Sequence, residues 1–133
     1  MNKLILITAS ILGMLAILLG AFASHGLKGS ISIESLQTFE TGVRYQMYHA
    51  IVLLFIGTTS VFSTKTKNLL FYLIISGILF FSGSIYGLAT NELSGFDFRT
   101  IAFVTPLGGL LLIISWAIMM LQFLKLKSDK YRF

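Results

Sequence analysis

The chain has no cysteine, a single proline and few charged residues. Without cysteine there can be no disulfides, no thiolate metal sites and no cysteine nucleophiles. Charged residues make up only 11% of the chain, against about a quarter in soluble domains. Hydrophobic residues make up 56%, and the mean hydropathy is +0.88. These values exclude a soluble domain and indicate a membrane protein.

Four apolar segments are long enough to cross a bilayer. We expect membrane-spanning helices over residues 4–24, 45–63, 69–89 and 103–124. The first segment also resembles a secretory signal peptide, but its apolar run is longer than such a peptide needs, so we interpret it as a retained helix. Residues 1–133 are therefore predicted to form a single all-α membrane domain, an integral membrane four-helix bundle.

An amphipathic segment over residues 32–44 precedes the second predicted span. Ser32 can cap this helix at its N-terminus. Its apolar side chains recur at steps of three and four residues, at Ile33, Leu36, Phe39, Val43 and Met47. This pattern predicts an interfacial lead-in helix, and Gly42 is the expected position of a bend into the membrane.

The positions of the basic residues predict the topology. The side that both termini share carries seven of them: Lys3, Lys65, Lys67, Lys125, Lys127, Lys130 and Arg132. The opposite side carries Lys28, Arg44 and Arg99. Because basic loops stay in the cytoplasm, we expect a multi-pass protein of the cytoplasmic (inner) membrane with both termini cytoplasmic. The net charge of +5 then reflects topology, and we expect no nucleic-acid partner.

Polar residues gather around the start of the second predicted span. Glu40 and Arg44 are four residues apart, as are Tyr45 and His49, so each pair can meet on one helix face. We predict an outer-side polar cluster, structural or binding, formed by His25, Glu40, Arg44, Gln46, Tyr48, His49, Tyr86 and Thr105. Polar groups in a membrane must be paired. Tyr86 and the serines of the third span are expected to form hydrogen bonds between helices.

Three interpretations of this cluster remain open. In a structural clasp, a Glu40–Arg44 ion pair holds the helix turn and His49 binds a neighbouring backbone carbonyl. In a metal site, His25, Glu40 and His49 hold zinc or iron, but the spacing matches no metal motif. In a proton relay, His49, Glu40 and Tyr48 carry protons, but no acid or base lies in the cytoplasmic half of spans two to four, so a path through the membrane is missing. We expect no catalytic residues, no cofactor and no bound metal, because no catalytic motif is present.

Small residues predict where helices approach each other closely. Gly83 and Gly87 form a G-x-x-x-G spacing in the third span. Thr105 is expected to cap the fourth span, with Pro106 at its first helical position. The predicted helix-packing residues are Gly13, Gly20, Gly83, Gly87, Pro106, Gly108 and Gly109.

Four blocks of residues resemble a known family. They are GAF and HGL at 20–22 and 25–27, TGVRYQMYH at 41–49, FSGSIY at 81–86 and TPLGG at 105–109. In this order they resemble the YgdD/YwdK-like proteins (the domain of unknown function 423 family), which are small four-span membrane proteins. The family more often has G-A-F-G-A-H where this chain has Ala23 and Ser24 before His25. The resemblance implies the fold and a membrane location, and it implies no particular activity.

The expected function is a non-enzymatic accessory or scaffold subunit, or a lipid-binding protein. The expected partners are membrane lipid and a larger membrane protein or a second copy of the chain. The alternative is a small transporter or proton-coupled channel that uses His25, Glu40, Arg44 and His49 as a gate.

Overall fold

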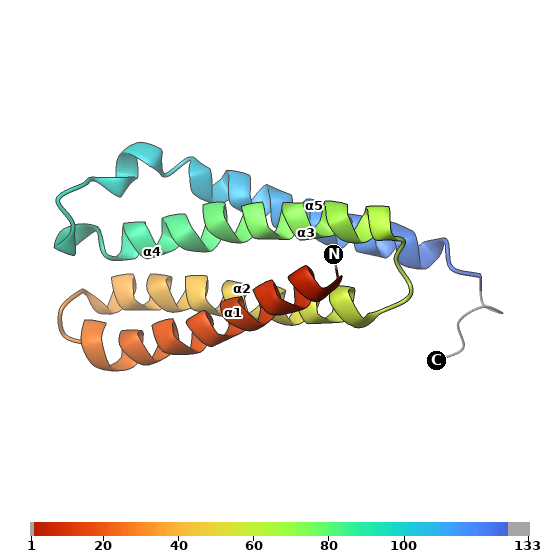
Figure 1. The fold of residues 1–133 in the computed structure, drawn as a ribbon. Helices are drawn as coiled ribbons and strands as arrows, with labels where there is room; N and C mark the ends of the chain where they lie inside the picture. The colour runs from red at the N-terminus through yellow and green to blue at the C-terminus, as the bar shows by residue number, and fades with distance from the viewer. Residues whose placement is uncertain (1, 128–133) are drawn as a thin grey trace.

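The computed structural model describes residues 2–127 and is an all-α membrane bundle, which confirms the predicted fold class (Figure 1). In chain order its elements are α1 (Asn2–Phe22), the π-helix η1 (Ala23–Leu27), α2 (Ile33–Thr58), α3 (Thr64–Ile78), the π-helix η2 (Leu79–Gly83), α4 (Ser84–Ala89), the 3₁₀ helices η3 (Asn91–Leu93) and η4 (Phe98–Ile101), and α5 (Val104–Leu124). Helices α3, η2 and α4 follow one another without a break and act as one rod.

Three helical segments within residues 2–127 are long and apolar enough to cross a membrane. They are Asn2–Leu27, Thr64–Ala89 and Val104–Leu124. Helix α2 is more polar, yet it runs the length of the bundle beside the others (Figure 1). Two of its polar side chains, Gln46 and His49, are buried in the protein. The lower hydropathy of α2 thus comes partly from residues that face other helices, and its assignment as the second span stays a prediction, as do the span boundaries.

The lead-in and the second predicted span form one continuous α-helix, which is not interrupted at Gly42, the expected position of a bend. Ser32 caps α2 as predicted, because its hydroxyl accepts a hydrogen bond from the Ser35 amide at 3.0 Å. Gly42 has a packing role instead. A Cβ atom there would lie 2.7 Å from the ring of Tyr86, so the missing side chain lets α4 approach α2 closely.

The helices form two layers, with α1 and α2 in one and α3, η2, α4 and α5 in the other (Figure 1). Helix α2 packs against α1 on one side and against the α3–α4 rod on the other, and α5 packs along that rod. The main core contains Ile5, Ala9, Leu53, Ile56, Phe62, Leu70, Phe71, Ile74, Ile78, Leu112 and Met119. A smaller core near the η1 turn contains Ala23, Leu27, Ile31, Phe39 and Ala89. In lipid such contacts stabilise by close packing rather than by removal from water.

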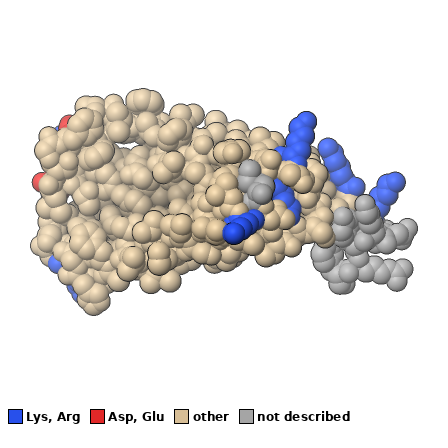
Figure 2. All heavy atoms as spheres, viewed as in Figure 1, with Lys and Arg blue, Asp and Glu red and all other residues tan. Residues whose placement is uncertain are grey.

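On the face that Figure 2 shows, the charged side chains lie toward the two ends of the bundle and the middle is uncharged. At the basic end, where α1 and α3 begin and α5 ends, are Lys3, Lys65, Lys67, Lys125 and Lys127. The half of the bundle toward the opposite, acidic end carries Glu34, Glu40, Glu92 and Asp97, with Lys28, Arg44 and Arg99. Lys130 and Arg132 lie outside the described residues. This segregation fits the predicted topology, while the orientation in the membrane stays a prediction.

Candidate functional site

Gln46 links three helices through one side-chain amide. It lies on the inner face of α2 and is only 4% exposed. Its Nε2 donates a hydrogen bond to the carbonyl oxygen of Leu12 in α1 at 2.8 Å. Its Oε1 accepts one from the hydroxyl of Tyr86 in α4 at 2.6 Å. Because the Leu12 carbonyl can only accept, the amide has a single orientation that satisfies both partners.

Two serines of the α3–α4 rod make further links between helices, as the sequence predicts. Ser82, in the π-helix η2, donates to the carbonyl oxygen of Gly42 in α2 at 2.8 Å. Ser84 lies 2.5 Å from the hydroxyl of Thr105 in α5. The Ser84 hydroxyl can also donate to the carbonyl of Phe80, one turn back. In that case the Thr105 hydroxyl is the donor in the bond between Thr105 and Ser84. A π-helical turn changes which residues face which neighbour, and here Ser82 faces α2 while Ser84 faces α5.

His49 connects α2 to α5 through Trp116. The indole Nε1 of Trp116 donates to Nε2 of His49 at 3.1 Å. Indole has no acceptor, so Nε2 of His49 carries no proton. The other nitrogen, Nδ1, therefore carries the proton and donates to the carbonyl of Tyr45 at 2.7 Å. The predicted bond from His49 to a neighbouring carbonyl is confirmed, and both ring nitrogens are engaged.

An open groove of about 280 Å³ lies beside this bond. Its lining comes from α2, η2 and α5 and consists of Tyr45, His49, Phe81, Gly109, Leu112, Ile113 and Trp116. Trp116 was not among the predicted site residues. Its signal in the sequence is a single indole in the middle of an apolar helix, where the N–H needs an acceptor.

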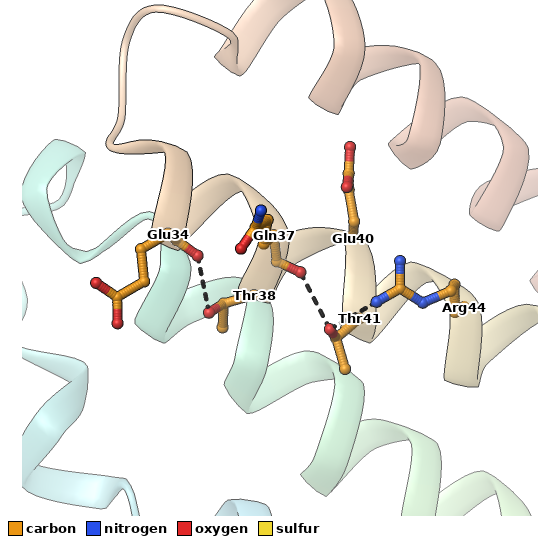
Figure 3. Close-up of a pocket in the computed structure, with 6 residues that line it drawn as sticks. All are labelled: Glu34, Gln37, Thr38, Glu40, Thr41 and Arg44. Carbon is orange, nitrogen blue, oxygen red and sulfur yellow. Dashed lines mark hydrogen bonds between the residues drawn. The ribbon is translucent and has the colours of Figure 1, made fainter.

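A second polar surface, the α2 outer face, lies at the acidic end. A depression of about 520 Å³ there is lined by Glu34, Gln37, Thr38, Glu40, Thr41 and Arg44 (Figure 3). The hydroxyls of Thr38 and Thr41 donate to backbone carbonyls one turn back, at 3.1 and 3.0 Å. These two hydroxyls can therefore only accept further hydrogen bonds. The charged side chains extend beyond them (Figure 3).

The Glu40–Arg44 ion pair predicted for the clasp is not formed. Arg44 Nη2 instead donates to the hydroxyl of Thr41 at 3.0 Å, while Glu40 points away from the guanidinium (Figure 3). Within residues 2–127, the one ion pair closer than 4.0 Å joins Asp97 and Arg99. Spacing by four residues permits an ion pair but does not force it, because exposed pairs of this kind contribute little.

The predicted polar cluster is thus divided between three places. Gln46, His49, Tyr86 and Thr105 lie between helices, and Glu40 and Arg44 belong to the α2 outer face. The remaining two, His25 and Tyr48, are exposed on η1 and α2. In the described part of the chain, no group of three or more His, Cys, Asp or Glu side chains is placed to hold a metal ion. The structure therefore does not bring His25, Glu40 and His49 together.

The packing glycines differ in how closely a neighbour approaches. At Gly108, a Cβ atom would overlap the backbone nitrogen of Phe81 and lie 2.7 Å from the carbonyl carbon of Phe80. At Gly87 it would lie 2.6 Å from the ring of Phe98, in the connection that precedes α5. No atom lies within 4 Å of such a Cβ at Gly83. The G-x-x-x-G spacing therefore does not form a helix–helix contact.

The other predicted packing positions make looser contacts. Gly13, Gly20 and Gly109 would place a Cβ atom at ordinary van der Waals distances of 3.5 Å or more. Pro106 is the third residue of α5, not the first, because the helix already begins at Val104. Its missing N–H still falls among the amides that have no partner in a helix's first turn. Thr105 is likewise inside the helix and does not cap it.

Two tight glycines were not predicted. A Cβ atom at Gly57 would lie 2.7 Å from Leu6 of α1, and one at Gly77 would lie 2.6 Å from Leu112 of α5. Neither glycine belongs to a motif, so only the rotation of each helix in the bundle reveals its role.

Comparison with known proteins places the chain in a family. The family model described as "Protein of unknown function (DUF423)" matches residues 19–109. A UPF0382 membrane protein of Staphylococcus aureus is 38% identical over 123 residues, which cover 92% of this chain and 97% of the relative. The UPF0382 membrane protein YwdK of Bacillus subtilis is 37% identical over 128 residues, covering 92% and 98%. A UPF0382 membrane protein of Haemophilus influenzae is 36% identical over 115 residues, covering 86% and 88%. No solved structure matches the chain. The resemblance read from the sequence is confirmed, and the chain belongs to the DUF423 family of membrane proteins of unknown function.

Proposed function

We propose that this protein is a non-enzymatic accessory protein of the cytoplasmic membrane that binds a phospholipid headgroup on the α2 outer face. One contrast carries the proposal. The polar groups between the helices, such as Gln46 and His49, are hydrogen-bonded to residues of other helices. The charged groups of the α2 outer face surround an open depression instead. This division of polar groups supports a function in binding at the surface.

The charges on the α2 outer face suit a zwitterionic headgroup. The guanidinium of Arg44 can hold a phosphate through two parallel hydrogen bonds. The carboxylates of Glu34 and Glu40 line the same depression and suit a primary ammonium group. A phosphate and an ammonium separated by two carbons form the headgroup of phosphatidylethanolamine.

The depth of the α2 outer face also suits a headgroup. Tyr45 follows Arg44 directly and Tyr48 lies four residues after Arg44; they are 41% and 51% exposed. Exposed tyrosines are typical of the boundary between hydrocarbon and headgroups. With the basic end in the cytoplasm, as the positive-inside rule favours, this boundary belongs to the outer leaflet.

Transport has less support than binding. A proton path through the bundle needs a chain of acids and bases. Among the buried polar residues of the described chain, His49 is the one histidine and none is a carboxylic acid. His49 cannot accept a proton on Nε2 without losing the bond from Trp116.

The test is retention of defined lipids on the purified full-length protein, measured by native mass spectrometry. We expect phosphatidylethanolamine to be retained in preference to phosphatidylcholine, whose trimethylated ammonium cannot donate to Glu34 or Glu40. Arg44→Gln should lower retention at least tenfold, because hydrogen bonds to charged groups contribute about 1.5–3 kcal/mol. Lys28→Gln is the matched control, since Lys28 is basic, lies at the same end and does not line the depression.

Three results would contradict the proposal. Equal retention of both lipids would remove the headgroup preference. A stoichiometric protein that co-purifies and is lost in Arg44→Gln would assign the face to protein docking. Proton or ion flux in liposomes that His49→Ala abolishes would favour the transporter.

A further inference from the structure

The groove beside the His49–Trp116 bond offers an occupant few free polar groups. It measures about 280 Å³ and lies between α2, η2 and α5. The indole N–H of Trp116 already donates to His49, whose other ring nitrogen donates to the carbonyl of Tyr45. Apart from the hydroxyl of Tyr45, the other side chains of the lining carry no polar group. The groove therefore suits a hydrocarbon chain better than a ligand that needs several hydrogen bonds.

The groove follows the α2 outer face along one stripe of α2. Thr41 lines the depression, and Tyr45 and His49 line the groove. Residues four apart on a helix are neighbours on one face, so these three side chains follow one another. Each step of four residues advances about 6 Å along the helix axis. A ligand whose head occupies the depression, and which extends along α2 into the membrane, therefore reaches the groove within about one helix turn.

The polar groups along this stripe follow the order of the groups in a phospholipid. A phospholipid has its phosphate and headgroup first, then its ester carbonyls and then its acyl chains. Arg44 at the depression suits the phosphate. Tyr45 comes next, is 41% exposed, and has a hydroxyl that can donate to an ester carbonyl. Helix side chains lean toward the helix N-terminus, so Tyr45 leans from the groove toward the depression.

We propose that one acyl chain of the phosphatidylethanolamine on the α2 outer face lies in this groove, with its ester carbonyl bound by Tyr45. This position rests on the proposed function, because the headgroup must first be held on the α2 outer face. Lipid tails are as apolar as the groove, so the chain itself contributes little to the affinity. Its position instead brings it against Trp116, the only tryptophan of the protein.

The experiment uses Trp116 as a reporter, because bromine atoms on an acyl chain quench the fluorescence of a nearby indole. The full-length protein is reconstituted in phosphatidylcholine vesicles that contain increasing fractions of a brominated lipid. Brominated phosphatidylethanolamine is compared with brominated phosphatidylcholine, which carries the same chains. Trp116 is 52% exposed, so the second lipid measures quenching by unbound lipid around the bundle. We expect the first lipid to quench at about tenfold lower fractions, the preference that one hydrogen bond from its ammonium to a carboxylate confers.

Two variants fill the groove without changing the α2 outer face. Gly109→Leu adds a side chain to the groove wall, and Gly83→Leu is its control, since a Cβ at Gly83 meets no atom within 4 Å. Ile113→Phe enlarges another residue of the wall, which is 66% exposed and therefore tolerates the change if Gly109→Leu does not fold. Its control is Leu110→Phe, on the exposed surface of α5 outside the groove. Each groove variant should bring the two brominated lipids to equal quenching, and each control should keep the difference.

Retention of unbrominated lipids, measured by native mass spectrometry, separates this proposal from the proposed function. The groove variants should still retain phosphatidylethanolamine in preference to phosphatidylcholine, because the headgroup site is intact. Equal quenching by the two brominated lipids in the unaltered protein, with this preference preserved, would overturn the position of the chain and leave the headgroup site standing. Excess quenching that persists in both groove variants would place the chain elsewhere and overturn it as well. Loss of the retention preference in the unaltered protein would refute the proposed function, and the position of the chain would fall with it.

Discussion

Substitution of Gly108 by alanine tests how α5 docks on the α3–α4 rod. The added Cβ would overlap the backbone nitrogen of Phe81 and lie 2.8 Å from the Cβ of Phe80. These are atoms of a helix backbone and its first side-chain carbon, which cannot rotate away. Helix α5 must therefore move outward, and the nearby bond between Ser84 and Thr105 would lengthen from 2.5 Å.

The size of the effect follows from opposing terms. Overpacking in a tight core costs about 1–3 kcal/mol, and this site lies at the upper end because backbone atoms are involved. A weakened hydrogen bond between membrane helices adds about 0.6 kcal/mol. The better helix propensity of alanine returns about 1 kcal/mol. We expect Gly108→Ala to lower the free energy of unfolding by about 2 kcal/mol.

Two neighbouring glycines provide matched controls. Gly109→Ala places a Cβ at 3.5 Å from the ring of Phe81, and Gly83→Ala meets no atom within 4 Å. Neither should destabilise, and each can gain up to about 1 kcal/mol from helix propensity. The assay is equilibrium unfolding by dodecyl sulfate in mixed micelles, followed by the fluorescence of Trp116, the only tryptophan. If Gly83→Ala lost as much stability as Gly108→Ala, the contact between α5 and η2 would be wrong.

Two further perturbations test the His49 bond and the loop at the acidic end. Trp116→Phe keeps an aromatic ring but removes the donor to His49 Nε2; we expect a loss of about 1 kcal/mol in dodecyl sulfate unfolding followed by circular dichroism, and an unchanged stability would show that the bond is not formed. Side-chain and backbone hydrogen bonds from Arg99 lower the pKa of Asp97 to about 2. Because the folded pKa lies below the unfolded value, this stabilisation is complete above about pH 4 and is lost as the pH falls toward 2. Asp97→Asn should therefore lower the Tm at pH 7 and lower it less at pH 2; an equal difference at both pH values would refute this.

The sequence predicted the features that depend on composition and on local pattern. Long apolar runs with charges only at their ends indicated an all-α membrane bundle. The Ser32 cap and the serines that join helices also followed from residue type and position. Each of these features follows from a hydrogen-bonding requirement that holds in any fold. An amide at the start of a helix and a hydroxyl inside a membrane both need a partner.

Features that depend on the rotation of a helix could not be predicted. Gly42 has the same place in the pattern whether the helix bends or packs closely there, and only the Tyr86 ring beside it decides. Gly83 looked like a packing glycine but faces no neighbour. The carbonyl of Leu12, which accepts from Gln46, is a backbone atom and leaves no mark in the sequence.

The division of the polar cluster was also beyond the sequence. Spacing by four residues placed Glu40 and Arg44 on one face but gave no reason to choose Glu40 over Thr41 as the partner of Arg44. Trp116 is the one site residue that a closer reading could have identified, since an indole in the middle of a span needs an acceptor.

The central claim is that buried polar residues of α2 hold the bundle together by pairing with residues of other helices. A double-mutant cycle on Gln46 and Tyr86, measured by dodecyl sulfate unfolding, tests it most directly. Gln46→Leu and Tyr86→Phe should each destabilise, and the double variant should lose less than the sum of the two. We predict a coupling of about 0.6–1.7 kcal/mol, the range found for hydrogen bonds between membrane helices. Losses that add to within about 0.3 kcal/mol would contradict the claim.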